Sequence, residues 1–127
     1  MTANRNSQLG LLCLAHILIS ADGMIDQKEF EALSKIKVKE SISDALFKEF
    51  ENEIKDKKGK DIYITGVDLL NLCTDDEKLN AFAHLYKMAE ADGSVHIKEV
   101  RLLLYTIKSS RIEFNDVVAR AKSMVDY

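Results

Sequence analysis

Two copies of the tripeptide Ala-Asp-Gly place a carboxylate directly before a glycine and a second carboxylate seven residues after the first. The carboxylate pairs are Asp22 with Glu29 and Asp92 with Glu99. Carboxylate oxygens are the ligands that hard divalent cations such as calcium prefer. The same spacing occurs in the downstream half of an EF-hand loop, where glycine at position 6 makes a sharp turn and glutamate at position 12 binds calcium. The pattern therefore predicts cation chemistry at two places.

The first copy matches the downstream half of such a loop completely. With Gly23 at loop position 6, Asp22 stands at position 5, Asp26 at position 9 and Glu29 at position 12. Position 1, which is normally an aspartate, is Leu18. The upstream half of the loop therefore lacks its first carboxylate.

The second copy has the same gap and a weaker centre. Glu90 stands at position 3, Asp92 at position 5 and Glu99 at position 12, but His96 stands at position 9 and Met88 at position 1. Because affinity in these loops falls with the number and charge of the ligands, we expect each half loop to bind calcium weakly, if it binds at all.

A purely structural interpretation of the motif stays open beside the metal hypothesis. Gly23 and Gly93 can end a helix in the left-handed conformation. Asp26 and Glu29 fit a capping box for the helix that follows, where carboxylates also favour the positive end of the helix dipole. Each residue of the motif thus has a role in folding as well as a possible role in binding.

The elements that must position these residues are helices. Apolar residues recur at helical spacing in nearly every segment, and strict alternation is rare. The first helix is apolar nearly all round, so we expect it to be the central buried helix or part of an oligomer contact. The periodicity predicts about seven helices, at 5–20, from about 26, at 42–57, at 62–73, from about 75, after the second Asp-Gly, and from about 113.

Local signals sharpen several of these predictions. Thr74 and Glu77 form a capping-box signature that opens the fifth helix. The lysine-rich stretch 55–60 reads as a solvated linker. We expect Phe30 of the second helix and Leu104 of the sixth to point inward with their apolar neighbours.

Length and duplication together predict one domain. A chain of 127 residues can close a single core, and the absence of proline with only five glycines favours helices. We predict an all-α fold in which a single compact domain spans 1–127. Its three-helix halves, roughly 5–57 and 74–127, are pseudo-duplicated and joined by a short connector.

Charge and cysteine content limit the partners and the cellular compartment that we expect for this protein. The net charge of -3 comes from interspersed charges of both signs, which argues against nucleic acid as a partner. Cys13 and Cys73 lie in apolar surroundings without ligand-like spacing, so we expect free, buried thiols in a reducing compartment. The apolar run 9–21 is too short for the roughly 20 residues of a membrane span. It also lacks the marks of a signal peptide, so we expect a cytoplasmic protein without direct membrane insertion.

No catalytic arrangement stands out. The sequence shows no phosphate loop, nucleophile elbow or other glycine-rich catalytic signature. Cys13 and His16 share a helical face, but no second ligand pair exists, so core packing is the better interpretation. His84 is isolated by the same test. We therefore expect no enzyme.

The duplicated Ala-Asp-Gly, the Ile or Val and the Glu that follow it, the seven predicted helices and the length together resemble the TerB family of tellurite resistance proteins. The resemblance implies candidate metal positions at Asp22, Glu29, Asp92 and Glu99, whereas Asp26 rests on loop geometry alone. It also implies a cytoplasmic stress-response role near membrane-associated partners. His96 departs from the family pattern, where a capping residue is usual.

Three functional hypotheses follow. The first is a non-enzymatic TerB-like scaffold or adaptor that binds a protein partner, with weak binding of a divalent cation such as calcium at the acidic turns. The second is a structural homodimer formed through the apolar first helix, with no metal role. The third is a metal-dependent hydrolase, against which the missing nucleophile argues.

Overall fold

The computed structural model describes residues 5–19, 27–91 and 97–124, apart from the side chains of 28–29, 91 and 97–99. The described residues form α-helices joined by short turns, and no strand occurs among them, so the predicted all-α fold is confirmed. The seven helices of this described part are α1 (Arg5–Ile19), α2 (Gln27–Lys39), α3 (Asp44–Lys55), α4 (Gly59–Asn71), α5 (Asp75–Ala91), α6 (Ile97–Ser109) and α7 (Phe114–Ser123).

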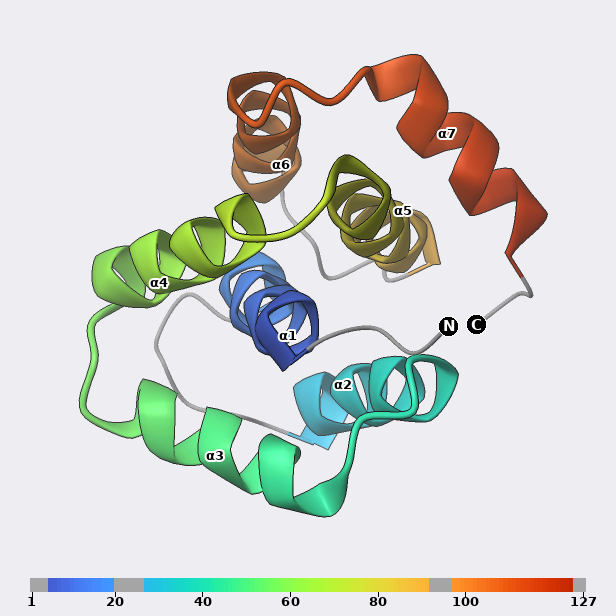
Figure 1. Ribbon diagram of the computed structural model, residues 1–127. Helices are drawn as coiled ribbons and strands as arrows, with labels where there is room; N and C mark the ends of the chain where they lie inside the picture. The colour runs from blue at the N-terminus through green and yellow to red at the C-terminus, as the bar shows by residue number, and fades with distance from the viewer. Residues whose placement is uncertain (1–4, 20–26, 92–96, 125–127) are drawn as a thin grey trace.

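Two helices lie at the centre of the molecule. Figure 1 shows α1 and α5 near the middle, with α2 and α3 on one side and α6 and α7 on the other. Helix α4 packs along α1, and α7 packs along α5. The two acidic turns of the sequence follow the two central helices, α1 and α5.

The helix bounds show the duplication directly. Helices α2 and α6 have 13 residues each, and α6 begins and ends 70 residues after α2. Helix α7 likewise begins 70 residues after α3. Only α4 has no counterpart in the described part of the chain. It is the connector between two copies of a three-helix unit.

The turns within the two copies share their backbone conformation. Ser41 and Arg111 have φ of 53° and 61°, the left-handed region that usually ends a helix at glycine. The N–H of Ile42 bonds the carbonyl of Lys37 beyond this turn, and the same bond recurs 70 residues later. Side chains at equivalent positions contact these turns. Gln8 Nε2 donates to the Glu40 carbonyl at 2.9 Å, and Lys78 Nζ, 70 residues later, donates to the Ser110 carbonyl.

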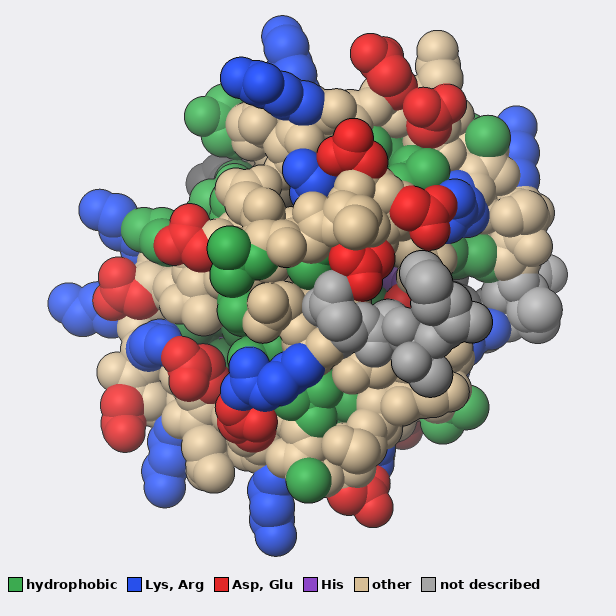
Figure 2. Space-filling model, viewed as in Figure 1, with side chains coloured by type: hydrophobic (Ala, Val, Ile, Leu, Met, Phe, Trp, Pro, Cys, Tyr) green, Lys and Arg blue, Asp and Glu red, His purple; other side chains and the backbone are tan. Residues whose placement is uncertain are grey.

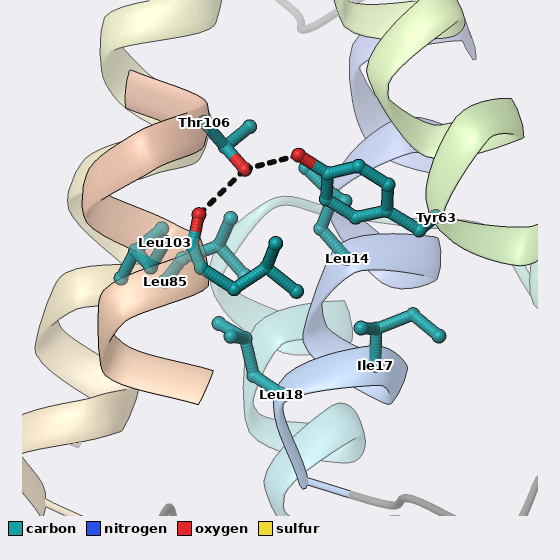
Figure 3. A pocket seen from close by; sticks show the side chains of 8 residues that line it. Leu14, Ile17, Leu18, Tyr63, Leu85, Leu103 and Thr106 are labelled. Carbon is teal, nitrogen blue, oxygen red and sulfur yellow. Dashed lines mark hydrogen bonds between the residues drawn. The ribbon is translucent and has the colours of Figure 1, made fainter. Parts of the chain in front are cut away.

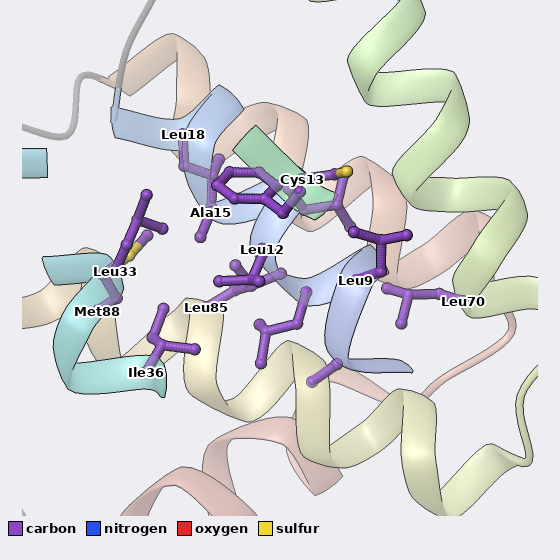
Figure 4. Close-up of a cluster of buried hydrophobic side chains, with 14 of the residues drawn as sticks. Leu9, Leu12, Cys13, Ala15, Leu18, Leu33, Ile36, Leu70, Leu85 and Met88 are labelled. Carbon is purple, nitrogen blue, oxygen red and sulfur yellow. The ribbon is translucent and has the colours of Figure 1, made fainter. Parts of the chain in front are cut away.

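Helix α1 forms the middle of the core. Its residues from Leu9 to His16 are all buried, as is Leu18. Figure 4 shows α1 side chains meeting others from α2, α4 and α5, including Leu33, Leu70 and Leu85. Of the two expectations for the first helix, the central buried helix is the one observed. A homodimer formed through α1 would require this core to open.

Helix α4 lies unusually close to α1 because glycines meet at the crossing. A Cβ added at Gly10 would lie 3.0 Å from the Gly66 carbonyl oxygen, and one added at Gly66 would lie 3.1 Å from Cys13 Cβ. The close approach explains why a glycine that weakens a helix by its own propensity stands inside α4. Gly66 is a packing residue.

Two predicted helix ends are corrected. Helix α3 begins at Asp44 rather than at 42, because the Ser43 hydroxyl accepts the N–H of Leu46 and caps the helix. Helix α4 begins at Gly59 rather than at 62, so the lysine-rich linker is shorter than predicted. The capping box of α5 is confirmed: Thr74 N–H donates to Glu77 Oε1 at 2.9 Å, and Glu77 N–H donates to Thr74 Oγ1 at 3.2 Å.

Two side chains predicted to point inward are exposed instead. Phe30 is 46% exposed and Leu104 is 41% exposed. In α2 the apolar residues Phe30, Leu33 and Ile36 are three positions apart. Three residues fall about 60° short of a full turn, so each successive side chain points in a direction rotated by that angle around the helix. Leu33 and Ile36 therefore reach the core, whereas Phe30 lies at its edge.

Candidate functional site

The two acidic turns occupy equivalent places in the two halves. Residues 20–26 connect α1 to α2, and residues 92–96 connect α5 to α6. Asp22, Asp26 and Asp92 lie outside the described residues. Glu29 and Glu99 are each the third residue of their helix, although their side chains are not among those described. The five predicted ligands therefore stay a prediction.

The helix positions of the two glutamates carry a physical consequence. Glu29 and Glu99 lie in the first turn of α2 and α6, where unpaired backbone N–H groups and the helix dipole favour negative charge. A carboxylate in this turn can serve the helix, a cation bound beside it, or both. The backbone positions agree with the capping interpretation and with the half-loop interpretation alike.

Within residues 5–19, 27–91 and 97–124, no three described His, Cys, Asp or Glu side chains come together as a metal site would require. Cys13 and His16 are both fully buried in α1. The His16 ring packs edge-on against Phe50 at 6.3 Å between centroids. Burial raises the pKa of the Cys13 thiol to about 12, so the thiol is neutral near pH 7 and a poor nucleophile or metal ligand.

A partly buried polar cluster around Glu40 has no signal in the sequence. Asn80 Nδ2 donates to Glu40 Oε1 at 2.5 Å, and His84 Nε2 lies 3.4 Å from the same oxygen. The side chains of Glu40 and His84 are only 16% and 6% exposed. Because Asn80 lies 40 residues from Glu40, no local spacing could have indicated the contact. The cluster joins the end of α2 to α5, across the two halves.

A second polar pair closes one end of a crevice between α4 and α6. Tyr63 Oη lies 2.6 Å from Thr106 Oγ1, and Thr106 in turn donates to the Leu102 carbonyl at 2.7 Å. Because the threonine hydroxyl has one proton, Tyr63 is the donor in this pair. Figure 3 shows both hydroxyls beside leucines of α1, α5 and α6.

The crevice itself is too small for a substrate. It encloses about 10 Å³, room for about one water molecule, and its lining is apolar apart from the paired hydroxyls. Ligand sites usually need roughly 300–1,000 Å³. The crevice is a packing gap beside α1.

A larger groove runs between α2 and α3. Its volume is about 500 Å³. Phe30 and Phe47 both line it and pack edge-on at 6.2 Å between their ring centroids. Lys37 bridges one end by an ion pair with Asp44, and this hydrogen bond lowers the pKa of the Asp44 carboxyl. The groove walls also carry Lys48 and Glu51.

These observations define a class of protein: an all-α domain built from two copies of a three-helix unit, with the Ala-Asp-Gly sequence after the first helix of each copy. The family model of tellurite resistance protein TerB matches residues 8–119. The chain therefore belongs to the TerB family. Searches of curated proteins and of solved structures each gave no significant match.

No helix in the described part of the chain combines the length and apolar character needed to cross a bilayer. This finding agrees with the short apolar run of α1, which the core buries.

Proposed function

We propose that this protein is a non-enzymatic stress-response scaffold that acts in the cytoplasm by holding a protein partner, and that its acidic turns tune this contact by weakly binding a divalent cation such as calcium. Asp22, Asp26 and Glu29 would supply ligands in the first turn, and Asp92 and Glu99 in the second. Membership of the TerB family supports the stress-response role.

One observation carries the proposal most directly. The glutamate of each motif lies at the same position of an equivalent helix, 70 residues apart, in a fold whose turns and side-chain contacts are also duplicated. The ligands are oxygen atoms, which suit calcium or magnesium better than softer metals. When bound, the cation would supply charge at the start of α2 and α6.

The first copy is the stronger candidate. Both copies have three carboxylates at ligand positions, but only the first has them at positions 5, 9 and 12, which completes the downstream half of the loop. The second has Glu90, Asp92 and Glu99 at positions 3, 5 and 12, with His96 at position 9. Because the downstream half of its loop is complete, we expect the first turn to fill before the second.

The scaffold role is tested by capture of partners from native lysate on the immobilised chain, with calcium or with a chelator. We expect a defined set of proteins that is retained with calcium and released by the chelator. The variant with Asp22→Asn and Asp92→Asn should lose the same set. If the same proteins are retained with and without calcium, and by the double variant, the proposed tuning is contradicted. If no proteins are retained, the scaffold role is contradicted.

A further inference from the structure

Helix α3 presents one stripe of alternating charge to solvent. Asp44, Lys48, Glu51 and Lys55 are all exposed and are spaced by four, three and four residues. At 100° per residue this spacing keeps the four side chains on one face of the helix. The order of signs along the stripe is negative, positive, negative, positive.

This order of charges is complementary to itself. In an isologous contact between two copies, residue i meets residue j and residue j meets residue i. An antiparallel pairing of α3 with a second α3, centred between Lys48 and Glu51, brings each Lys48 to Glu51 of the second copy. The same pairing brings Asp44 to Lys55 of the second copy, so every opposed pair has opposite charge.

The stripe is available for such pairing. Among the described residues, Lys48, Glu51 and Lys55 have no salt-bridge partner within 4.0 Å. Asp44 already pairs with Lys37 of its own chain, and a carboxylate has lone pairs for a second cation. In Figure 2, acidic and basic side chains are interspersed around the part of the molecule that Figure 1 labels α3.

The fold itself does not require these charges. Helix α7, the duplicate of α3, has Phe114, Val118 and Ala121 at the positions of Asp44, Lys48 and Glu51, and its Ala121 is buried. One copy of the helix therefore has an apolar face at these positions and the other a charged, exposed face.

The groove beside the stripe supplies apolar surface for the same contact. Phe30 packs edge-on against Phe47 and lines the same groove as Lys48 and Glu51, the two central residues of the stripe. A two-fold axis through the middle of α3 turns the Phe30 ring of each copy toward the other copy. The contact would then cover part of this ring, which is 46% exposed in the single chain.

We infer that two copies of this chain associate through α3, antiparallel to each other, with the charged stripes paired and the α2–α3 grooves facing the second copy. A helix of 12 residues is about 18 Å long, so the contact falls below the roughly 800 Å² per partner of a standard stable interface. The dimer is therefore weak, and because the paired charges lie in a small contact close to solvent, it weakens as salt rises.

The inference is tested by sedimentation velocity of the full chain over a concentration series at low and high salt. Either Lys48→Glu or Glu51→Lys places like charges opposite each other at two symmetric positions, and each should weaken association by about tenfold or more. The double exchange of Lys48→Glu with Glu51→Lys restores opposite charges across the axis and should return the association constant to within about threefold of wild type.

A matched control is Lys108→Glu on α6, which reverses an exposed charge away from α3 and should leave association unchanged. Melting curves of all variants check that the fold is kept. A chain that stays monomeric at every concentration in low salt would overturn the inference. So would a dimer that tolerates the single reversals, or a double exchange that fails to restore association.

Discussion

At the scale of single residues, the contact between α1 and α4 depends on the absence of two side chains. Gly10→Ala puts a Cβ 3.0 Å from the Gly66 carbonyl oxygen, and Gly66→Ala puts one 3.1 Å from Cys13 Cβ. We expect each to destabilise the protein by about 1–3 kcal/mol through overpacking, more than the gain in helix propensity of roughly 1 kcal/mol. Urea unfolding measures the difference.

Gly59→Ala is the control for these substitutions. Its added Cβ would meet only Ile17 Cδ1, at an ordinary 3.8 Å. Helix propensity then predicts unchanged or slightly higher stability, by up to about 1 kcal/mol. If Gly10→Ala and Gly66→Ala behaved like Gly59→Ala, the close crossing of α1 and α4 would be refuted.

The Glu40 cluster makes a separate prediction at the same scale. Glu40→Ala removes the carboxylate oxygen that accepts from Asn80 and lies beside His84, and we expect a loss of about 1–3 kcal/mol of unfolding free energy. Glu40→Gln keeps an acceptor oxygen and should cost clearly less. Equal losses for the two variants, measured by urea unfolding at pH 7, would show that the hydrogen bonds contribute little.

At the scale of elements, the two copies differ in how they cap their third helix. The Ser43 hydroxyl accepts the N–H of Leu46, whereas Glu113, with a similar extended backbone, makes no side-chain cap bond to α7. Glu113→Ser should therefore raise the unfolding free energy by about 0.5–1 kcal/mol, and Ser43→Ala should lower it by about 1 kcal/mol. Thermal melting of the two variants checks both signs. A lower melting temperature for Glu113→Ser would contradict the equivalence of the two caps.

Elements governed by local rules could be predicted from the sequence. The capping box of Thr74 and Glu77 fixed the start of α5, because both partners lie within four residues of each other. The sequence places the start of α4 three residues too late, because Gly59 and Lys60 share the glycine- and lysine-rich composition of the linker before them. The contacts of Glu40 with Asn80 and of Tyr63 with Thr106 join distant segments, and no spacing rule reaches them.

At the scale of the whole molecule, the duplication relates the fold to the candidate site. The repeated Ala-Asp-Gly predicted two equivalent halves, and the helix bounds of α2 and α6 show the same 70-residue offset. The metal positions could be predicted only as residue types and spacings, because three of the five lie outside the described residues and two have side chains that are not described. Each turn is expected to bind a cation only weakly, because position 1 of the loop has no carboxylate in either copy.

The most direct test of the central claim is thermal melting with and without calcium at constant ionic strength. A site with a dissociation constant of about 1 mM would gain about 1.4 kcal/mol from about 10 mM calcium. For a domain of this size the gain raises the melting temperature by roughly 5 °C. The rise should vanish in the variant with Asp22→Asn and Asp92→Asn, and it should persist in the exposed α4 control Asp68→Asn. No rise in the wild type, or an equal rise in the double variant, would contradict cation binding at the acidic turns.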